Sequence, residues 1–115
     1  MKLSADQMLS LWHRVTCDSL KRGLPDLTAR QMALLLQVYL EAPPHTVRGL
    51  AQSLGISKPA VTRALDRLGQ LDFVRRKREE ADRRSVQVQR TIKGSVFLRD
   101  LGDSPADSAR SLDRR

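Results

Sequence analysis

One stretch, Val47–Asp66, constrains the fold of this chain more than any other feature. Two short helices that cross tightly need a small residue at their contact and a residue that tolerates positive φ in the turn. Ala51 and Gly55 stand at those two places. Ser57 can cap the second helix, and Pro59 fits its first turn, where a missing N–H costs no hydrogen bond. The stretch therefore predicts a helix-turn-helix. Its small core is expected to contain Leu50, Leu54, Ile56, Val61 and Ala64.

Two further helices are predicted before this motif. Ser4 and Thr28 each stand three residues before a glutamine, which is the spacing of a capping box. Apolar residues recur at helical spacing after Ser4. Residues 32–40 are apolar almost all round, which predicts a central helix buried on most sides. Residues 1–45 are therefore expected to give helical support and a candidate dimer contact.

The pattern changes after residue 72. Residues 73–77 and 85–89 are strand-like, the second segment by alternation, and a charged loop joins them. Residues 92–101 predict a short helix, and residues 102–115 are polar without apolar period, which predicts a disordered tail. The expected fold class is mainly α with a small β-hairpin (α+β), a winged helix-turn-helix. The predicted domain spans residues 1–101, with the helix-turn-helix at 47–71 and the hairpin, or wing, at 73–91.

The positive charge is concentrated in the predicted wing. The formal net charge is +8, and residues 73–93 alone carry eight Lys or Arg against three Asp or Glu. Focused charge of this kind favours a docking surface for a polyanion over a merely solvated basic face. The chain has only one Trp, one Tyr and two Phe, which disfavours a stacking platform for single-stranded nucleic acid.

The sequence gives little support for disulfide, metal-binding or enzymatic chemistry. Cys17 is the only cysteine, so no internal disulfide can form, and it is expected to be an ordinary helix residue, with oxidant sensing as the alternative. His13 and His45 are too few and too distant for a metal site with that cysteine. Neither a nucleophile–base constellation nor a glycine-rich phosphate loop is present. The sequence therefore predicts neither an enzyme nor a cofactor. The N-terminus lacks a signal peptide pattern, and we expect a cytoplasmic protein without a membrane partner.

The motif itself suggests how a duplex would be read. The second helix of a helix-turn-helix lies in the major groove, which would make residues 58–71 the recognition helix and place the wing, residues 75–89, at the minor groove. Arg63 is the candidate for a base contact, since a guanidinium matches the two acceptors of guanine. Arg67 could equally pair with Asp66 or Asp72 or lie in solvent. The predicted contacts are Ser57, Lys58, Ala60, Thr62, Arg63, Arg67, Arg78, Arg83 and Arg84, with Asp82 orienting a wing arginine.

These features together resemble a known family. The order of helices and wing, with LGISKPAVTRALDRL and then ADRRSVQV followed by Thr91 and Gly94, is similar to the MarR family of bacterial transcription regulators over about residues 5–97. The resemblance implies that Asp82 and Arg84 orient each other and that Arg84 reaches the minor groove. It also implies that the recognition-helix contacts fall on Ser57, Lys58, Thr62 and Arg63.

Two departures from the family are visible. Family members usually dimerise through the N-terminal helix and two long C-terminal helices, but the sequence after Gly94 predicts only about two turns of helix before the polar tail, so a reduced or differently built dimer interface is expected. The family's glycine between recognition helix and wing is replaced by the run Leu71-Asp72-Phe73, so Asp72 is expected to cap that turn.

The sequence thus predicts a homodimeric, sequence-specific double-stranded DNA-binding transcriptional regulator, associated with the nucleoid when bound. The alternative is a winged-helix interaction module that acts through a protein partner in the transcription machinery. A repressor that senses a ligand is a third reading.

Overall fold

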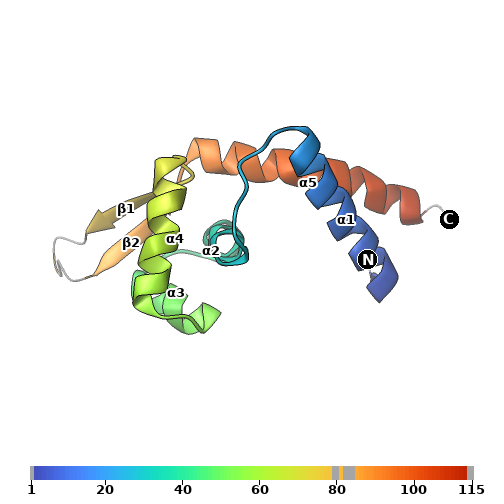
Figure 1. Cartoon of the computed structure of the whole chain (residues 1–115). Helices are drawn as coiled ribbons and strands as arrows, with labels where there is room; N and C mark the ends of the chain where they lie inside the picture. The colour runs from blue at the N-terminus through green and yellow to red at the C-terminus, as the bar shows by residue number, and fades with distance from the viewer. Residues whose placement is uncertain (1, 79–80, 82–84, 114–115) are drawn as a thin grey trace. The chain divides into compact units, whose positions relative to one another are not determined.

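The computed structural model describes residues 2–78, 81 and 85–113, with side chains described as far as residue 103 in the last helix. In this part of the chain, five helices and one antiparallel strand pair follow one another, as Figure 1 shows. The fold class predicted from the sequence is confirmed. The elements are α1 (Ala5–Lys21), α2 (Ala29–Leu40), α3 (Val47–Leu54), α4 (Lys58–Gln70), β1 (Val74–Arg78), β2 (Val86–Arg90) and α5 (Ile92–Asp113).

The chain forms two compact units. One contains Leu27–Val96, which includes α2, α3, α4 and the hairpin. The other contains Met1–Asp26 and Phe97–Arg115. Each is described separately below.

The unit Leu27–Val96 is built around side chains of α2 and α4. Leu34, Leu35 and Val38 of α2 are fully buried, in agreement with the predicted central helix, although Leu40 at its end is exposed. Each such side chain stabilises the fold by roughly 1.5–3 kcal/mol through the apolar surface that it withdraws from water. α4 contributes Val61, Leu65 and Leu68, which are also fully buried.

The predicted helix-turn-helix is confirmed by its caps and its turn. Thr46 accepts a hydrogen bond from the Gly49 amide at 3.0 Å and so caps α3. Ser57 accepts one from the Ala60 amide at 3.2 Å and caps α4. Gly55 has φ 65°, the left-handed conformation that a side chain disfavours. The turn between α3 and α4 therefore depends on that glycine.

A non-glycine residue makes the corresponding turn after α4. Asp72 has φ 60°, and its amide donates to the Gly69 carbonyl at 3.0 Å. The Phe73 amide donates to the Leu68 carbonyl at 2.9 Å, which completes the hydrogen-bond pair of a Schellman motif. Aspartate is among the few residues that tolerate this conformation. The expectation that Asp72 takes over the glycine's role is confirmed.

The hairpin is fixed at its base as well as along its length. β1 and β2 pair in register from Val74↔Arg90 to Arg78↔Val86. The Val88 amide donates to the His45 carbonyl at 2.8 Å, so the loop before α3 extends the sheet locally. Val74 and Val88 are both buried, and they anchor one face of the hairpin in the core.

A hydrogen-bonded junction joins α2, the turn after α4, the wing and α5. The Tyr39 hydroxyl lies 3.0 Å from the Phe73 carbonyl oxygen and 2.7 Å from that of Thr91, and it accepts from the Thr91 amide at 2.8 Å. The Thr91 hydroxyl donates to the Asp72 carbonyl at 2.7 Å and accepts from the Gly94 amide at 3.0 Å. We call this set of five residues the Tyr39–Thr91 junction.

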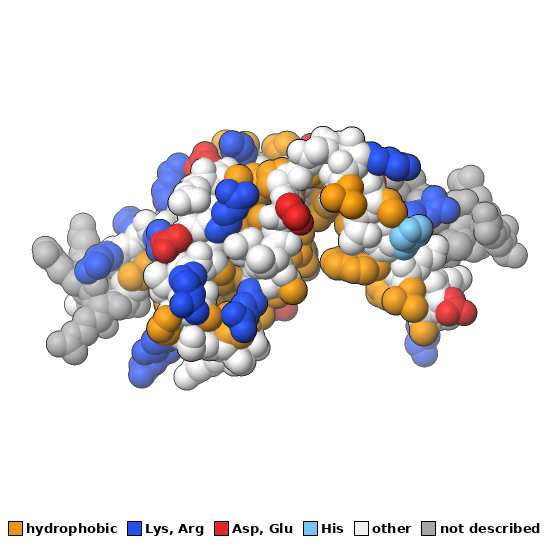
Figure 2. Space-filling model, viewed as in Figure 1, with side chains coloured by type: hydrophobic (Ala, Val, Ile, Leu, Met, Phe, Trp, Pro, Cys, Tyr) orange, Lys and Arg blue, Asp and Glu red, His pale blue; other side chains and the backbone are white. Residues whose placement is uncertain are grey.

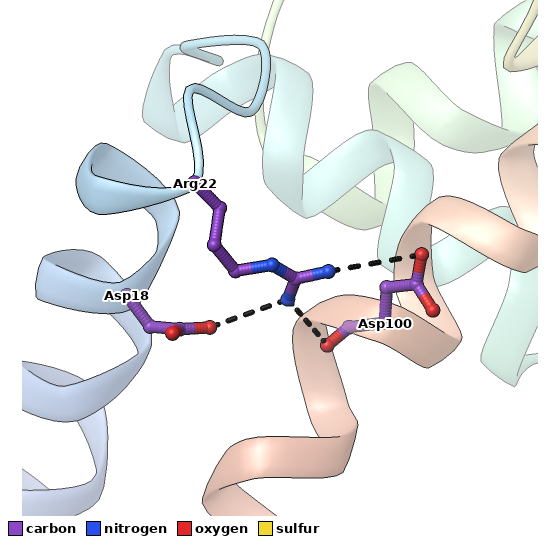
Figure 3. A network of polar contacts seen from close by, with 3 residues as sticks. All are labelled: Asp18, Arg22 and Asp100. Atoms are coloured by element: carbon purple, nitrogen blue, oxygen red, sulfur yellow. Dashed lines mark hydrogen bonds and ion pairs between the residues drawn. The ribbon is translucent and has the colours of Figure 1, made fainter.

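The other unit contains α1 and most of α5. Ser4 forms the predicted capping box at the start of α1, and Arg22 follows the helix end. The guanidinium of Arg22 lies 3.3 Å from the Asp18 carboxylate and donates to the Asp100 carbonyl at 3.2 Å (Figure 3). A second nitrogen of Arg22 lies 3.8 Å from the Asp100 carboxylate. Arg22 thereby links the end of α1 to α5.

The C-terminal segment differs from its prediction. α5 continues to Asp113, whereas the sequence suggested a short helix at 92–101 and a disordered tail at 102–115. Once a helix is nucleated, each added residue fixes only its own dihedrals and gains one hydrogen bond. Ala106, Ala109 and Leu112 are good helix formers, and α5 continues through Gly102 and Pro105 although both disfavour a helix interior, Pro105 because it has no N–H to donate.

Two of the helical glycines, Gly94 and Gly69, should respond oppositely to alanine. A Cβ at Gly94 would overlap the Tyr39 hydroxyl and the Phe73 carbonyl oxygen, whereas one at Gly69 meets open space. We expect Gly94→Ala to lower the free energy of unfolding by about 1–3 kcal/mol. Gly69→Ala, the control, should be neutral or raise it by up to about 1 kcal/mol. Urea unfolding measures both, and equal effects would contradict the packing described for the Tyr39–Thr91 junction.

Candidate nucleic-acid interface

The outer side of α4 carries most of the residues predicted to meet DNA. Lys58, Thr62, Arg63 and Arg67 are exposed, and Ser57 is exposed at the helix start. Their position follows from helical spacing, because Val61, Ala64, Leu65 and Leu68 turn the opposite side into the core. Lys and Arg side chains are visible over α4 in Figure 2. α4 thus presents a polar, largely cationic surface.

Ala60 departs from the prediction. Its side chain is only 7% exposed and packs with the buried stripe of α4. It lies one turn before Ala64, on the side that the helix turns toward the core. Ala60 therefore does not belong to the exposed face of α4, which leaves its side chain little surface for the predicted contact.

An ion pair modifies the charge of this surface. The Asp66 carboxylate, which is exposed on α4, lies 2.8 Å from a guanidinium nitrogen of Arg76 on β1. Arg76 thus neutralises the one carboxylate that α4 carries, and the pair links the recognition helix to the wing. This partner is not predictable from the sequence, because only the folded hairpin brings the two residues together.

For Arg67 the sequence left three alternatives open: a contact with DNA, an ion pair with Asp66 or Asp72, or exposure to solvent. Among the described residues it forms no ion pair with Asp66 or Asp72, since Asp66 is held by Arg76. Arg67 is exposed in the last turn of α4, where a cation also interacts favourably with the helix dipole.

The wing is only partly described. Arg78 ends β1 and its side chain is exposed. Asp82, Arg83 and Arg84, the predicted wing-tip residues, lie outside the described residues. The other end of the hairpin is engaged internally, since Arg90 donates to the carbonyls of Val38 and Glu41 at 2.9 Å each. Arg90 therefore closes the C-terminus of α2.

One exposed cation of the helix-turn-helix was not predicted. Arg48 is exposed in the first turn of α3, two residues after the Thr46 cap. The first helix of such a motif crosses the phosphate backbone when the second enters the groove. The signal in the sequence is an arginine two residues after a capping threonine, and attention to the recognition helix alone overlooks it.

Two other kinds of site were sought in the same residues. No group of three or more His, Cys, Asp or Glu side chains that could hold a metal ion occurs within residues 2–78, 81 and the described side chains from 85 onward. None of the described helices combines the length and the apolar character that crossing a bilayer requires.

Two crossed helices with a glycine turn, followed by a hairpin anchored beside the second helix, define a winged helix-turn-helix protein. The sequence profile of the MarR family matches residues 27–86, which is more than half of the chain. The chain belongs to the MarR family.

Individual proteins agree with this assignment. The HTH-type transcriptional regulator PecS of Dickeya dadantii (strain 3937) is 28% identical over 88 residues, which cover 75% of this chain. The match covers 53% of PecS, so the chain spans about half the length of that curated relative.

Solved structures show the same fold. The transcriptional regulator Tm0710 of Thermotoga maritima matches with a TM-score of 0.76 at 21% identity, over 93% of this chain and 72% of that one. The MepR–DNA complex of S. aureus matches with a TM-score of 0.73 at 20% identity, over 94% of this chain and 86% of that one.

The Asp66–Arg76 pair should couple α4 to β1 only modestly. Both side chains are partly exposed, so a double-mutant cycle with Asp66→Asn and Arg76→Gln should give a coupling of about 0.2–1 kcal/mol in low salt. The coupling should shrink as salt is raised toward about 1 M, because exposed charges are screened. Urea unfolding measures each corner of the cycle. A coupling that is zero at low salt would mean that the pair does not connect the two elements in solution.

Proposed function

We propose that this protein is a sequence-specific double-stranded DNA-binding transcriptional regulator that acts in the cytoplasm. One observation carries the proposal: a helix capped by Ser57 projects Lys58, Thr62 and Arg63 from a rigid turn, with its Asp66 carboxylate neutralised by Arg76. The MepR structure of the same fold is a DNA complex, which supports this reading.

The residues of α4 divide by the chemistry of the duplex. Ser57 and Lys58 stand at the helix N-terminus, where backbone N–H groups and the dipole favour a phosphate. Thr62 and Arg63 lie about one turn further on, within the N-terminal half that approaches base edges. Arg63 reads a guanine in this proposal, because its five donors in a fixed fork match the N7 and O6 acceptors. Arg67 and Arg48 add phosphate contacts at the two borders of the motif.

The wing completes the interface in this proposal. Arg78 and the tip arginines Arg83 and Arg84 approach the minor groove, where the potential is most negative when the groove is narrow. Asp82 holds one of these arginines in orientation, as the family resemblance implies.

A homodimer is the assembly that we propose. The outer side of α1 carries Met8, Leu9 and Trp12, which are 54%, 65% and 55% exposed. Hydrophobic side chains are visible on this helix in Figure 2. Apolar residues clustered in this way mark association surfaces more often than isolated ones do. A two-fold dimer would place two α4 helices on half-sites about one turn of DNA apart.

Arg63→Ala tests the base contact. We expect affinity for the best site, selected from a random duplex library, to fall by about 1–3 kcal/mol, with relaxed preference at one position. Affinity for unrelated duplex should change little. Lys93→Ala removes an exposed cation from α5 and serves as the control. Fluorescence anisotropy measures both proteins, and an unaltered selected site with Arg63→Ala would remove Arg63 from the base contacts.

Trp12→Glu tests the dimer. A buried charge without a partner is strongly unfavourable, so we expect this variant to be monomeric where the parent protein is dimeric. Ser10→Glu places the same charge on the other side of α1 and should leave the dimer intact. Light scattering gives the mass of each protein. A parent protein that is already monomeric, or a dimeric Trp12→Glu variant, would contradict the proposed use of α1.

A further inference from the structure

A groove of about 350 Å³ lies between the C-terminal end of α2 and α3. All of its lining residues belong to the unit Leu27–Val96, and none of them is among the residues proposed to contact DNA. Glu41 is the only carboxylate in this lining, and no Lys or Arg contributes to it. The volume is that of a site for a small organic molecule. We call it the α2–α3 groove.

Two of the lining residues are bonded to each other and connect the two helices. Gln37 Nε2 of α2 donates to Ser53 Oγ of α3 at 2.7 Å. This bond uses a donor of the Gln37 amide and leaves its Oε1 atom as an acceptor. Oε1 has no hydrogen-bond partner among the described residues. The bond therefore holds an unpaired acceptor at the wall of the groove.

The carboxylate of Glu41 adds a negative charge to the groove. Glu41 follows Gln37 by four residues and caps the end of α2. Its carbonyl oxygen accepts from Arg90 at 2.9 Å and lies 3.1 Å from His45 Nε2, which fixes the backbone at this position. No Lys, Arg or His in the described part of the chain lies within ion-pair distance of its carboxylate. The groove therefore keeps a local negative charge in a protein whose net charge is +8.

His45 supplies a second acceptor. Its side chain is buried, with 7% exposed. A carbonyl oxygen only accepts, so Nε2 carries the hydrogen in the contact with Glu41, and in the neutral ring Nδ1 is then an acceptor. Nδ1 has no hydrogen-bond partner among the described residues, yet none of their unpaired side-chain nitrogen or oxygen atoms is fully buried. A molecule in the groove can therefore supply the donor that Nδ1 lacks.

A second groove, of about 390 Å³, is also lined by His45 and has the opposite charge. Arg90 contributes to this lining and no carboxylate does. A cation placed there would be repelled by the guanidinium. Only the α2–α3 groove combines a carboxylate with unpaired acceptors, and this combination indicates the chemistry of its ligand.

We propose that the α2–α3 groove binds a small aliphatic cation that carries a guanidinium or a primary ammonium group. Both groups have several N–H donors and no acceptor, which complements a carboxylate, an amide oxygen and an imidazole nitrogen. Glu41 pairs with the positive charge, while Gln37 Oε1 and His45 Nδ1 accept further hydrogen bonds. Leu50 and Pro44, which also line the groove, contact the methylene chain of the ligand.

A competing explanation is hydration, in which water satisfies the same acceptors. In that case a cation would be attracted to Glu41 only as it is to any exposed carboxylate. Such attraction is weak in water and does not depend on N–H donors. The two explanations therefore separate in a comparison of cations that have the same charge but different donors.

An NMR titration of the isotope-labelled protein with agmatine, without DNA, tests the proposal. Agmatine joins a guanidinium to a primary ammonium by a short methylene chain. We expect saturable shifts of amides at the end of α2 and in α3, with a Kd of about 1 mM or tighter. The Nδ1 signal of His45 should move as well, whereas the ring signals of His13, which is exposed on α1, should stay fixed. Hexamethylated putrescine has the same charge and no N–H, and it should bind at least about 10-fold more weakly.

A matched pair of variants tests the carboxylate. Glu41→Gln removes the charge, and we expect it to weaken agmatine binding by about 10-fold or more, because hydrogen bonds to charged groups are among the strong ones. Asp26→Asn makes the same change of net charge at an exposed carboxylate outside the groove and should leave the affinity unchanged. The spectrum of each variant without ligand verifies that it is folded.

Three outcomes would overturn the proposal. Agmatine that causes no saturable shifts would remove the site. Equal affinities for agmatine and hexamethylated putrescine would leave only unspecific attraction of charge. Equal losses in Glu41→Gln and Asp26→Asn would show that net charge, and not the groove, determines binding. Because no DNA is present, each of these outcomes leaves the proposed duplex binding untouched.

Discussion

The arrangement of the domain depends on one half-buried tyrosine hydroxyl and its hydrogen bonds. The Tyr39 hydroxyl meets backbone groups from both ends of the wing, and Thr91 carries the connection on to Asp72 and to the start of α5. Backbone groups at such a crossing would be costly to bury without partners. The tyrosine satisfies them with one side chain, and the missing Cβ of Gly94 leaves it the room to do so.

The same hairpin also determines which surface charges are paired within the protein. β1 directs Arg76 to the Asp66 carboxylate, while β2 directs Arg90 to the end of α2. Two of the wing's arginines, although exposed, are therefore engaged by partners within the protein. The net charge of residues 73–93 therefore overstates the number of cations that a ligand could bind. The alternation of side chains along each strand determines which cations remain available.

Much of the fold follows from local rules. Capping residues at Ser4, Thr28 and Ser57, together with the glycine turn at Gly55, act over a few residues, so the sequence alone predicts them. The tertiary pairs were out of reach, because Tyr39 bonds to residues 34 and 52 positions away and the Asp66–Arg76 pair forms only when β1 folds back beside α4. Ala60 was misplaced since a small residue is compatible with either side of a helix, and packing alone decides. The length of α5 was underestimated because its second half has no apolar period and contains Gly102 and Pro105, through which the helix nevertheless continues.

The amide of Val88 bonded to the His45 carbonyl has a consequence for association. It fastens the middle of β2 to the loop that leads into α3, so the wing and the helix-turn-helix share one framework before any partner arrives. Segments that are ordered beforehand lose little conformational freedom on complex formation, and more of the contact energy then appears as affinity. Because the strands of this wing are already ordered, binding requires the domain to find the correct orientation but does not require these strands to find a new conformation.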